Sequence, residues 1–335
     1  MNGCFVCKEG GRLRYTYGNG RYETIRERLD MCPDIITENN LEQHRAALRS
    51  VDVIFCTWDM VPFSASQLAA YFPSLKAVFY AAGSVQYFAR PFMARGIRIS
   101  SAWQTMARPV AEFTVAMITL ANKGALPAMR RYQTESMAES NKPTRLVYPG
   151  TYQTAVGILG AGAIGSLVIR MLQAYPVDLM VYDPFISREK MDRLNLTRTY
   201  SLEDVFSSCQ TISNHIANNP QTVGMLHNGL FARMKKHAAF INTGRGAQVV
   251  EADLARALRE EPLRQAYLDV TWPEPIAPDS ELRQLPNVFI TPHIAGYAAQ
   301  EVNELADSMI EEYDRFSKGL PLVREVTPSM LEHMA

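Results

Sequence analysis

The stretch Ala155–Gly165, with the sequence AVGILGAGAIG, decides the fold of this 335-residue chain. Its apolar first half predicts a buried parallel strand, and its glycines permit a tight turn into an apolar helix over about 164–174. A second apolar strand, predicted at about 177–182, ends in Asp183, 18 residues after the last glycine. A strand, a glycine turn, a helix and a second strand in this order predict a βαβ unit of a parallel sheet.

The glycine turn has the spacing G-x-G-x-x-G, formed by Gly160, Gly162 and Gly165. The first glycine permits the tight turn, the second leaves the backbone open to a pyrophosphate, and the third lets the helix pack close to the strand. The turn, which includes Ala163 and Ile164, leads into a helix. The free N–H groups and the dipole at the start of that helix favour the binding of phosphate. A turn used only for packing is the alternative, but the flanking strands favour dinucleotide binding.

Asp183 stands where an acid contacts the adenosine ribose in such units. Its carboxylate accepts hydrogen bonds from ribose hydroxyls and repels a 2′-phosphate. The sequence therefore predicts NAD as the cofactor, in preference to NADP.

The composition indicates a two-domain globular protein, with 47% hydrophobic residues and 34 basic against 34 acidic side chains. No basic stripe appears, which argues against a nucleic-acid partner. No apolar run reaches the length of a membrane span, and the first residues do not resemble a signal peptide, so we expect a cytoplasmic protein. Cys4 and Cys7 have no second pair nearby to complete a zinc site, and we interpret both as residues of the first strand or its flank. A redox or metal role is the alternative, and no metal site is expected.

The first hundred residues alternate short apolar runs with helical patterns, which indicates a second parallel sheet. Strands are expected at 34–37, 51–56, 75–80 and 97–100, and helices at 22–31, 41–48 and 65–71. After the strand at 75–80 comes a loop of small residues, 81–85. Its backbone N–H groups suit a substrate carboxylate, and an ordinary strand-to-helix turn is the alternative; this loop alone favours neither.

Three late strands, expected at 238–242, 265–268 and 287–291, each lead into a polar side chain. These side chains are Arg245, Glu274 and His293. Each has an ordinary alternative by itself: a salt bridge, a solvated acid or a hydrogen-bonded histidine. Parallel strands end at one edge of a sheet, so the three are expected to converge at the edge that carries the glycine turn.

This set of side chains suits hydride transfer to a 2-keto acid. Arg245 would hold the carboxylate in a bidentate clamp and polarise the keto group. His293 would give a proton to the carbonyl oxygen and take it back in reverse, while Glu274 would orient the imidazole and favour its protonated form. The hydride chemistry itself belongs to the cofactor.

The sequence resembles the D-isomer-specific 2-hydroxyacid dehydrogenase family. The matching pieces are VAEFTVAMITLA at 110–121, GILGAGAIG at 157–165, YDP at 182–184, INTGRG at 241–246, LDVTWPEP at 268–275 and TPHIAGY at 291–297. The resemblance implies an α/β fold with two doubly wound parallel-sheet domains. A Rossmann domain that binds NAD, 104–296, is inserted into a flavodoxin-like substrate-binding domain, 1–103 and 297–335.

The resemblance also implies the site. Its catalytic residues are Arg245, Glu274 and His293, and the substrate carboxylate lies near the backbone of Gly83, Ser84 and Val85 as well as Arg245. His293, Asp269, Thr243 and His215 join Gly160, Gly162, Ala163, Ile164, Gly165 and Asp183 along the cofactor. The family forms homodimers through the cofactor domain, and 123–152 resembles its dimer arm.

The chain departs from the family at the substrate loop, where AAGSVQYF, 81–88, replaces a GVDN-like run. The identity of the 2-hydroxy acid therefore stays open, as does whether five aromatic residues line the cleft or only pack: Trp58, Trp103, Trp272, Tyr80 and Tyr297. The predicted function is that of an NAD-dependent D-2-hydroxyacid dehydrogenase or 2-keto acid reductase. The alternative is an NAD(H)-sensing, corepressor-like interaction protein with the same fold. NADH oxidation against a panel of 2-keto acids discriminates between them.

Overall fold

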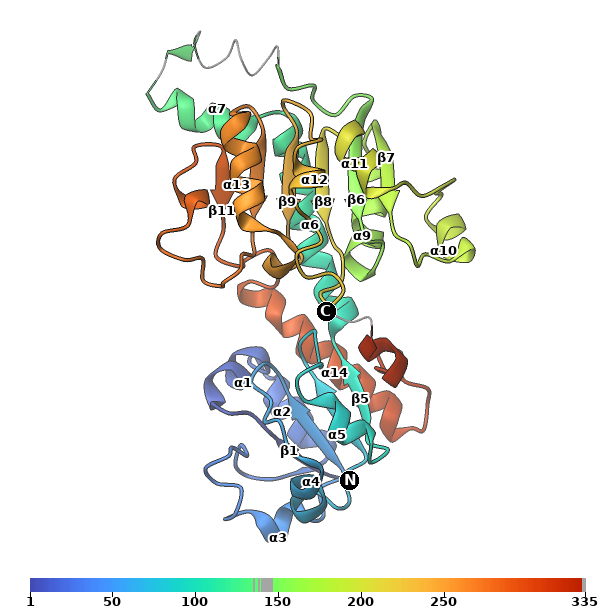
Figure 1. Cartoon of the computed structure of the whole chain (residues 1–335). Helices are drawn as coiled ribbons and strands as arrows, with labels where there is room; N and C mark the ends of the chain where they lie inside the picture. Colours follow the sequence, from blue (N-terminus) through green and yellow to red (C-terminus); the bar gives the residue numbers. More distant parts are fainter. Residues whose placement is uncertain (135, 138, 140–146, 333–335) are drawn as a thin grey trace. The chain divides into compact units, whose positions relative to one another are not determined.

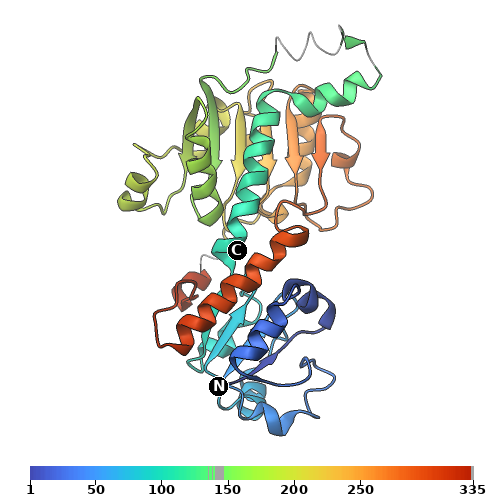
Figure 2. The same cartoon turned by 180° about the vertical axis from the view of Figure 1, so that it is seen from behind.

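The computed structural model describes residues 1–134, 136–137, 139 and 147–332, which divide between two compact units (Figure 1). Unit 1 comprises Met1–Met106 together with Tyr297–Ala335, and unit 2 comprises Ala107–Gly296. Each unit contains one sheet with helices on both faces, as the two opposite views in Figure 1 and Figure 2 show. Each unit therefore has its own hydrophobic cores and its own sheet edge.

The sheet of unit 1 has five strands, all parallel, in the order β2-β1-β3-β4-β5. This is the flavodoxin-like order, with its switch point between β1 and β3. The strands are β1 (Asn2–Phe5), β2 (Asp30–Met31), β3 (Val53–Cys56), β4 (Ala77–Tyr80) and β5 (Arg98–Ser101). Cys4 lies in β1 and Cys7 just beyond it, and both thiols are buried, as expected of residues in or beside a first strand.

Helices cover both faces of this sheet. One core packs side chains of α1, α2 and α14 on the sheet, and the other packs those of α3, α4 and α5. Their bounds are α1 (Gly10–Thr16), α2 (Arg21–Arg28), α3 (Arg45–Leu48), α4 (Ala65–Tyr71), α5 (Ala89–Met93) and α14 (Val302–Ser317), with 3-10 turns η3 (Ala299–Glu301) and η4 (Pro328–Glu332). The C-terminal segment after α14 returns to β5, where Ser101 N donates to Arg324 O.

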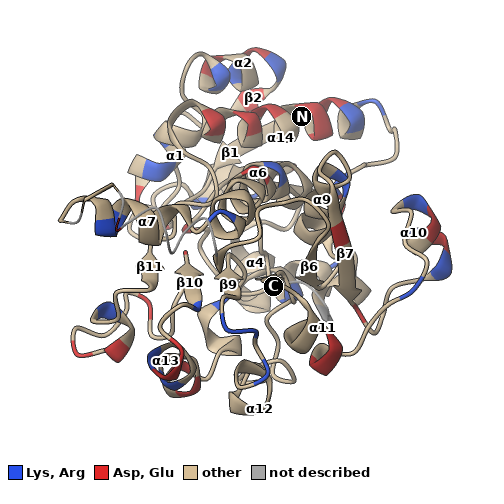
Figure 3. Cartoon of the chain, turned by 90° about the horizontal axis from the view of Figure 1, so that it is seen from above, with Lys and Arg blue, Asp and Glu red and all other residues tan. Residues whose placement is uncertain are grey.

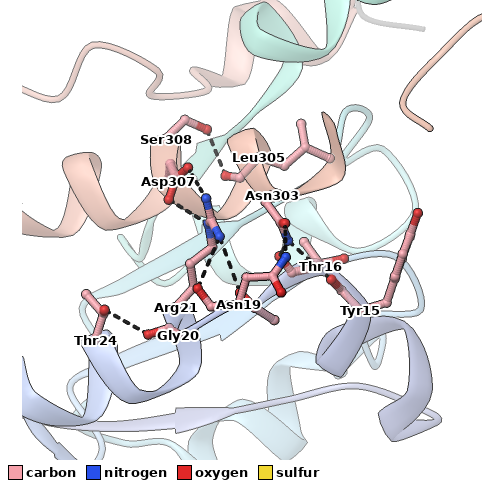
Figure 4. A network of polar contacts seen from close by, with 11 residues as sticks. Tyr15, Thr16, Asn19, Gly20, Arg21, Thr24, Asn303, Leu305, Asp307 and Ser308 are labelled. Carbon is pink, nitrogen blue, oxygen red and sulfur yellow. Dashed lines mark hydrogen bonds and ion pairs between the residues drawn. The ribbon is translucent and has the colours of Figure 1, made fainter. Parts of the chain in front are cut away.

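Polar contacts join α14 to the end of α1, the start of α2 and the turn between them (Figure 4). Arg21 donates from Nε and Nη2 to the two carboxylate oxygens of Asp307, both at 2.7 Å. Asn19 Nδ2 donates to Asn303 Oδ1 at 2.8 Å, and Asn303 Nδ2 donates to Thr16 O at 3.1 Å. A bidentate arginine–carboxylate pair fixes geometry as well as adding energy, so the late helix is held in register on the first two.

The second strand differs from the sequence prediction. The helix expected over 22–31 ends at Arg28, β2 occupies Asp30–Met31, and the strand expected at 34–37 is reduced to one bridge between Ile36 and Val6. Proline biases the residue before it toward extended backbone and donates no N–H. Pro33 therefore ends the pairing of β2, and Arg26 Nη2 donates to the Pro33 carbonyl at 2.6 Å.

The sheet of unit 2 has six parallel strands in the order β11-β10-β9-β8-β6-β7. They are β6 (Thr154–Leu159), β7 (Val177–Tyr182), β8 (Thr211–Asn214), β9 (Ala239–Asn242), β10 (Gln265–Leu268) and β11 (Val288–Ile290). At the edge of the sheet, Tyr200 N donates a backbone hydrogen bond to Val181 O in β7 at 2.9 Å. The order reverses between β6 and β8, which is where ligands bind in such sheets.

Helices also cover both faces of the unit 2 sheet, with α6 and α9 on one face and α11, α12 and α13 on the other (Figure 2 and Figure 1, respectively). Their bounds are α6 (Trp103–Asn122), α7 (Ala125–Tyr132), α9 (Ala163–Leu172), α10 (Arg188–Arg193), α11 (Leu202–Ser208), α12 (Asn228–Phe231) and α13 (Glu251–Glu260), with 3-10 turns η1 (Gly246–Gln248) and η2 (Glu281–Arg283). The predicted fold class, two doubly wound parallel sheets, is confirmed. The segment 123–152 contributes α7, and residues 135, 138 and 140–146 of it lie outside the described residues.

Charges of both signs alternate on individual helices, as α2, α10 and α13 show in Figure 3. None of the described helices combines the length and apolar character that a membrane span needs. Among the same residues, no group of three or more His, Cys, Asp or Glu side chains is placed to hold a metal ion.

Candidate active site

The glycine turn follows β6 and opens α9, and its three glycines have different surroundings. Gly160 has a φ of +86°, and a Cβ there would lie 2.9 Å from His215 O. A Cβ on Gly165 would lie 2.0 Å from Gly160 O, whereas a Cβ on Gly162 would meet nothing within 4 Å. The first and third glycines are thus required by packing. The second leaves open space beside the first N–H groups of a ten-residue helix, which fits a phosphate group.

Asp183 follows β7, next to the glycine turn. Its Oδ2 accepts a hydrogen bond from Ala161 N at 2.8 Å, and its Oδ1 accepts one from Phe185 N at 2.9 Å. Each carboxylate oxygen has further lone pairs, so these bonds orient the side chain without exhausting its capacity to accept. The acid is fixed directly to the turn that it was predicted to serve.

His215 follows β8 on the other side of the glycine turn. Its Nε2 lies 2.9 Å from Ser213 Oγ, and its buried Nδ1 has no hydrogen-bond partner among the described residues. Burial lowers the pKa of His215 to about 3. The imidazole is therefore neutral at physiological pH and suits contact with a ligand or with the backbone rather than ion pairing.

Arg245 stands just beyond β9. Its side chain is half-buried, and Nη1 donates to the Gly244 carbonyl at 2.8 Å. Burial lowers the pKa of Arg245, and the negative charge of Glu274 opposes that shift. A Cβ on Gly246 would lie 2.0 Å from the Thr271 backbone, so only glycine lets the end of β9 lie against the segment after β10. This close approach brings the guanidinium and the carboxylate of Glu274 into one electrostatic environment.

Glu274 and His293 are joined directly. His293 Nδ1 and Glu274 Oε1 form a hydrogen bond, with 49% and 39% of the two side chains exposed. His293 has a φ of +56°, a backbone conformation that a residue with a Cβ rarely adopts. Strained backbone of this kind persists where the surroundings over-determine it, and it concentrates at functional sites. The other ring nitrogen, Nε2, is the atom left for a reacting group.

Asp269 holds the turn that carries His293. Its carboxylate is 4% exposed and accepts from Thr291 Oγ1 at 2.6 Å, from Ile294 N at 2.8 Å and from Ala295 N at 3.0 Å. Its backbone carbonyl accepts from His293 N at 3.0 Å. A buried carboxylate needs such donors to offset the loss of water. The family resemblance implies a cofactor contact for Asp269, and its support of the histidine turn is a role that the sequence does not indicate.

Three buried carboxamides, Asn214, Asn242 and Gln248, were also missed by sequence reasoning. Asn214 and Asn242 end β8 and β9, and Gln248 ends η1. Asn214 Nδ2 donates to Asn242 Oδ1 at 3.1 Å and to Gln248 Oε1 at 2.7 Å. The available signal was an asparagine in the last position of both β8 and β9. Thr243, the next residue, is buried, and its Oγ1 lies 3.0 Å from Thr114 Oγ1 on α6.

The loop 81–85, which was predicted to bind the substrate carboxylate, lies in unit 1. Arg245, Glu274 and His293 all lie in unit 2. Gly83 and Ser84 are half-buried and Val85 is buried, and Ser101 Oγ donates to the Ala82 carbonyl at 2.8 Å. The aromatic residues differ in exposure. Tyr80 is buried, Tyr297 donates to Thr105 O at 2.7 Å, Trp58 and Trp103 are partly buried, and Trp272 is 68% exposed.

A family model matches residues 115–295, described as "D-isomer specific 2-hydroxyacid dehydrogenase, NAD binding domain". The D-3-phosphoglycerate dehydrogenase of Archaeoglobus fulgidus is 29% identical over 238 residues, 71% of this chain and 44% of that protein. The glyoxylate reductase of Korarchaeum cryptofilum is 27% identical over 260 residues, 77% of this chain and 76% of that protein. The chain thus spans less than half the length of the phosphoglycerate dehydrogenases of Archaeoglobus fulgidus and Synechocystis, 44% and 37%.

Solved structures share the fold at low sequence identity. The apo D-mandelate dehydrogenase of Rhodotorula graminis has a TM-score of 0.80 and 20% identity, with 97% of each chain covered. A phosphoglycerate oxidoreductase of Rhizobium etli has a TM-score of 0.81 and 22% identity, with 98% of this chain and 99% of that chain covered. Similarity at this level of identity establishes the architecture.

Proposed function

The chain belongs to the D-isomer specific 2-hydroxyacid dehydrogenase family, and from this we propose that it transfers a hydride between NAD(H) and a D-2-hydroxy acid or the corresponding 2-keto acid. The observation that carries this proposal is the hydrogen-bonded pair of Glu274 and His293, together with the electrostatic interaction of Glu274 with Arg245. These residues follow strands of the parallel sheet whose β6 leads into the glycine turn. A proton-transfer pair and a cation are the groups that the reduction of a keto acid requires from the protein.

Arg245 binds the substrate acid in this proposal. A guanidinium offers parallel N–H donors that match a carboxylate, and its remaining donor polarises the keto oxygen. Partial burial strengthens these contacts because fewer water molecules compete for the same donors. Arg245 thus serves both binding and the stabilisation of negative charge on the oxygen.

His293 transfers the proton. Its Nδ1 is occupied by Glu274, so Nε2 gives a proton to the substrate oxygen during reduction and accepts it during oxidation. Glu274 fixes the orientation of the ring through this hydrogen bond. Asp269 keeps the histidine turn in place through the three hydrogen bonds that its carboxylate accepts. NAD(H), when bound, supplies or accepts the hydride.

The cofactor-binding residues are proposed to be the turn residues Gly160, Gly162, Ala163, Ile164 and Gly165 with Asp183. The open space at Gly162 and the free N–H groups of α9 support a pyrophosphate there. The residues proposed along the nicotinamide half are His215, Thr243, Asp269 and His293.

Unit 1 is proposed to be the substrate-binding domain, and the Gly83–Val85 backbone is proposed as its contact to the substrate carboxylate. Its small residues and neighbouring N–H groups support that role. A homodimer through unit 2 is proposed from the resemblance of 123–152 to the family's arm. On α7 and just beyond it, Met129, Tyr132 and Met137 are 63%, 58% and 66% exposed, as an apolar interface requires.

The proposal is tested by NADH oxidation, followed by absorbance, against glyoxylate, hydroxypyruvate, phenylglyoxylate and 3-phosphohydroxypyruvate. We expect turnover with at least one acid, and a loss of about 10³-fold or more in kcat/KM in Arg245→Ala. Arg233→Ala, an exposed arginine of the same unit, is the matched control and should retain wild-type kinetics. Tight NADH binding without turnover of any acid would overturn the proposal and favour an NAD(H)-sensing interaction protein.

A further inference from the structure

Asn242 fixes the backbone on which Arg245 stands. Its side chain is 1% exposed, its Oδ1 accepts from Gly244 N at 3.1 Å, and its Nδ2 donates to the Arg245 carbonyl at 3.1 Å. One carboxamide thus bonds the N–H of the residue before the arginine and the carbonyl of the arginine itself, on the two sides of its Cα. The direction of the guanidinium depends on these two bonds, because they set the backbone from which the side chain starts.

Asn214 determines which way the Asn242 amide faces. Asn214 Nδ2 donates to Asn242 Oδ1 at 3.1 Å and to Gln248 Oε1 at 2.7 Å. A flipped Asn242 would set its NH₂ group against both the Asn214 NH₂ group and Gly244 N. A carboxamide has distinct donor and acceptor ends, so each of these hydrogen-bonded side chains determines the orientation of its neighbour.

Gln248 connects this hydrogen-bonded network to the loop after His215. Its Nε2 donates to the Ile216 carbonyl at 2.8 Å and to the Ala217 carbonyl at 3.0 Å, while Asn214 Oδ1 accepts from Ile216 N at 3.2 Å. This loop adjoins the glycine turn, where the Gly160 backbone lies against the His215 carbonyl. Three buried amides therefore connect the proposed dinucleotide loop to the proposed acid-binding arginine.

We propose that Asn214, Asn242 and Gln248 are positioning residues that hold Arg245 and the loop 216–217 in one fixed geometry. The inference rests on the proposed function, since it assigns the two held segments to acid and dinucleotide binding. Burying three amides is costly unless every polar atom is bonded, and apolar side chains would fill the same space without that requirement. What the amides add over packing is directional control of two backbone segments.

The test compares isosteric variants by calorimetric titration with NADH and with oxamate, an unreactive analogue of a 2-keto acid. Asn242→Asp removes the donor to the Arg245 carbonyl and sets an oxygen against it. We expect the Kd for oxamate at saturating NADH to rise about tenfold or more, while the Kd for NADH stays within about twofold. Gln248→Glu removes the donors to 216 and 217 and should instead raise the Kd for NADH about tenfold.

Asn122→Asp is the matched control. Asn122 is also buried, and its Oδ1 accepts from Thr211 Oγ1 at 2.6 Å, at the amino end of β8. The control should keep both Kd values within about twofold of wild type. If Asn242→Asp does not fold, Asn242→Ser, which loses the same donor without burying a charge, is measured with the same expectation.

Arg245→Ala, titrated alongside, separates the two proposals. If it binds oxamate as wild type does, the proposed function fails. If it binds oxamate weakly while Asn242→Asp matches Asn122→Asp, only the positioning inference is overturned. The inference is also overturned if Asn242→Asp and Gln248→Glu weaken both ligands in parallel with a lowered Tm, because that is the result of a general loss of stability.

Discussion

The two units have the same kind of sheet, yet the carboxyl ends of their strands carry different chemistry. In unit 2 the acid after β10, Asp269, is 4% exposed and receives three donors. In unit 1 the acid after β3, Asp59, has a side chain that is 40% exposed and lies 3.4 Å from Arg12. The buried side chains at the unit 1 edge include the hydroxyls of Thr57 and Ser101. A parallel sheet thus supplies the position, and the residues at its strand ends decide the chemistry.

The largest effect is expected from substituting His293, the proposed proton-transfer residue at the sheet edge of unit 2. His293→Ala should lower kcat about 10³-fold with a much smaller change in KM, because proton transfer is lost while Arg245 still binds the acid. Steady-state kinetics with the best acid of the panel measures both constants. An unchanged kcat would show that the charged edge of unit 2 is not where the chemistry occurs.

The two strand-end acids provide the next test. Asp269→Asn places an NH₂ group against donors of the histidine turn, so we expect kcat to fall about 30-fold, the size of a lost charge-assisted hydrogen bond in a buried site. Asp59→Asn, its counterpart in unit 1, is expected to change kcat less than threefold because a screened surface ion pair contributes little. Equal effects of the two substitutions would mean that burial of the acid does not matter.

His215 sharpens the comparison through pH. Its pKa is about 3 in the folded chain and 6.5 for an ordinary histidine, so the unfolded chain binds the extra proton first. This stability is therefore essentially complete at pH 7.5 and falls as the pH decreases through 6.5, by about 2 kcal/mol between pH 7.5 and 5. Urea unfolding at both pH values should show this loss in wild type. In His215→Gln the loss should be smaller by that amount, and an identical pH dependence would contradict the assignment.

A smaller effect than those of the unit 2 variants is expected for the loop of small residues in unit 1. A Cβ on Gly83 would lie 2.8 Å from Met106 Sδ, a flexible side chain that can move. Gly83→Ala should therefore fold and raise the KM for the acid about fivefold, since the shifted loop presents its N–H groups less well. Gly11→Ala in α1, where a Cβ meets nothing within 4 Å, is the control. Equal KM values in the two variants would exclude the loop from acid binding.

Much of the fold was predictable because its signals are local. The strand β7 and the strand β10 have the predicted bounds, and the glycine turn and Asp183 follow from spacing alone. The second strand was predicted at 34–37 because Ile35 and Ile36 form a short apolar run there. The observed strand, Asp30–Met31, is defined instead by its pairing with β1. Edge strands of two residues leave almost no periodic signal.

By itself, the sequence determined the parallel architecture, the nucleotide-type turn and the three side chains expected at one sheet edge. Only the tertiary structure decided how that edge is built: that Glu274 bonds His293, that Asp269 holds the histidine turn, and that Asn214, Asn242 and Gln248 orient one another beneath Arg245. The reason is physical. Hydrophobic periodicity and glycine spacing are encoded within a few residues, whereas a tertiary hydrogen bond joins atoms whose separation along the chain carries no pattern.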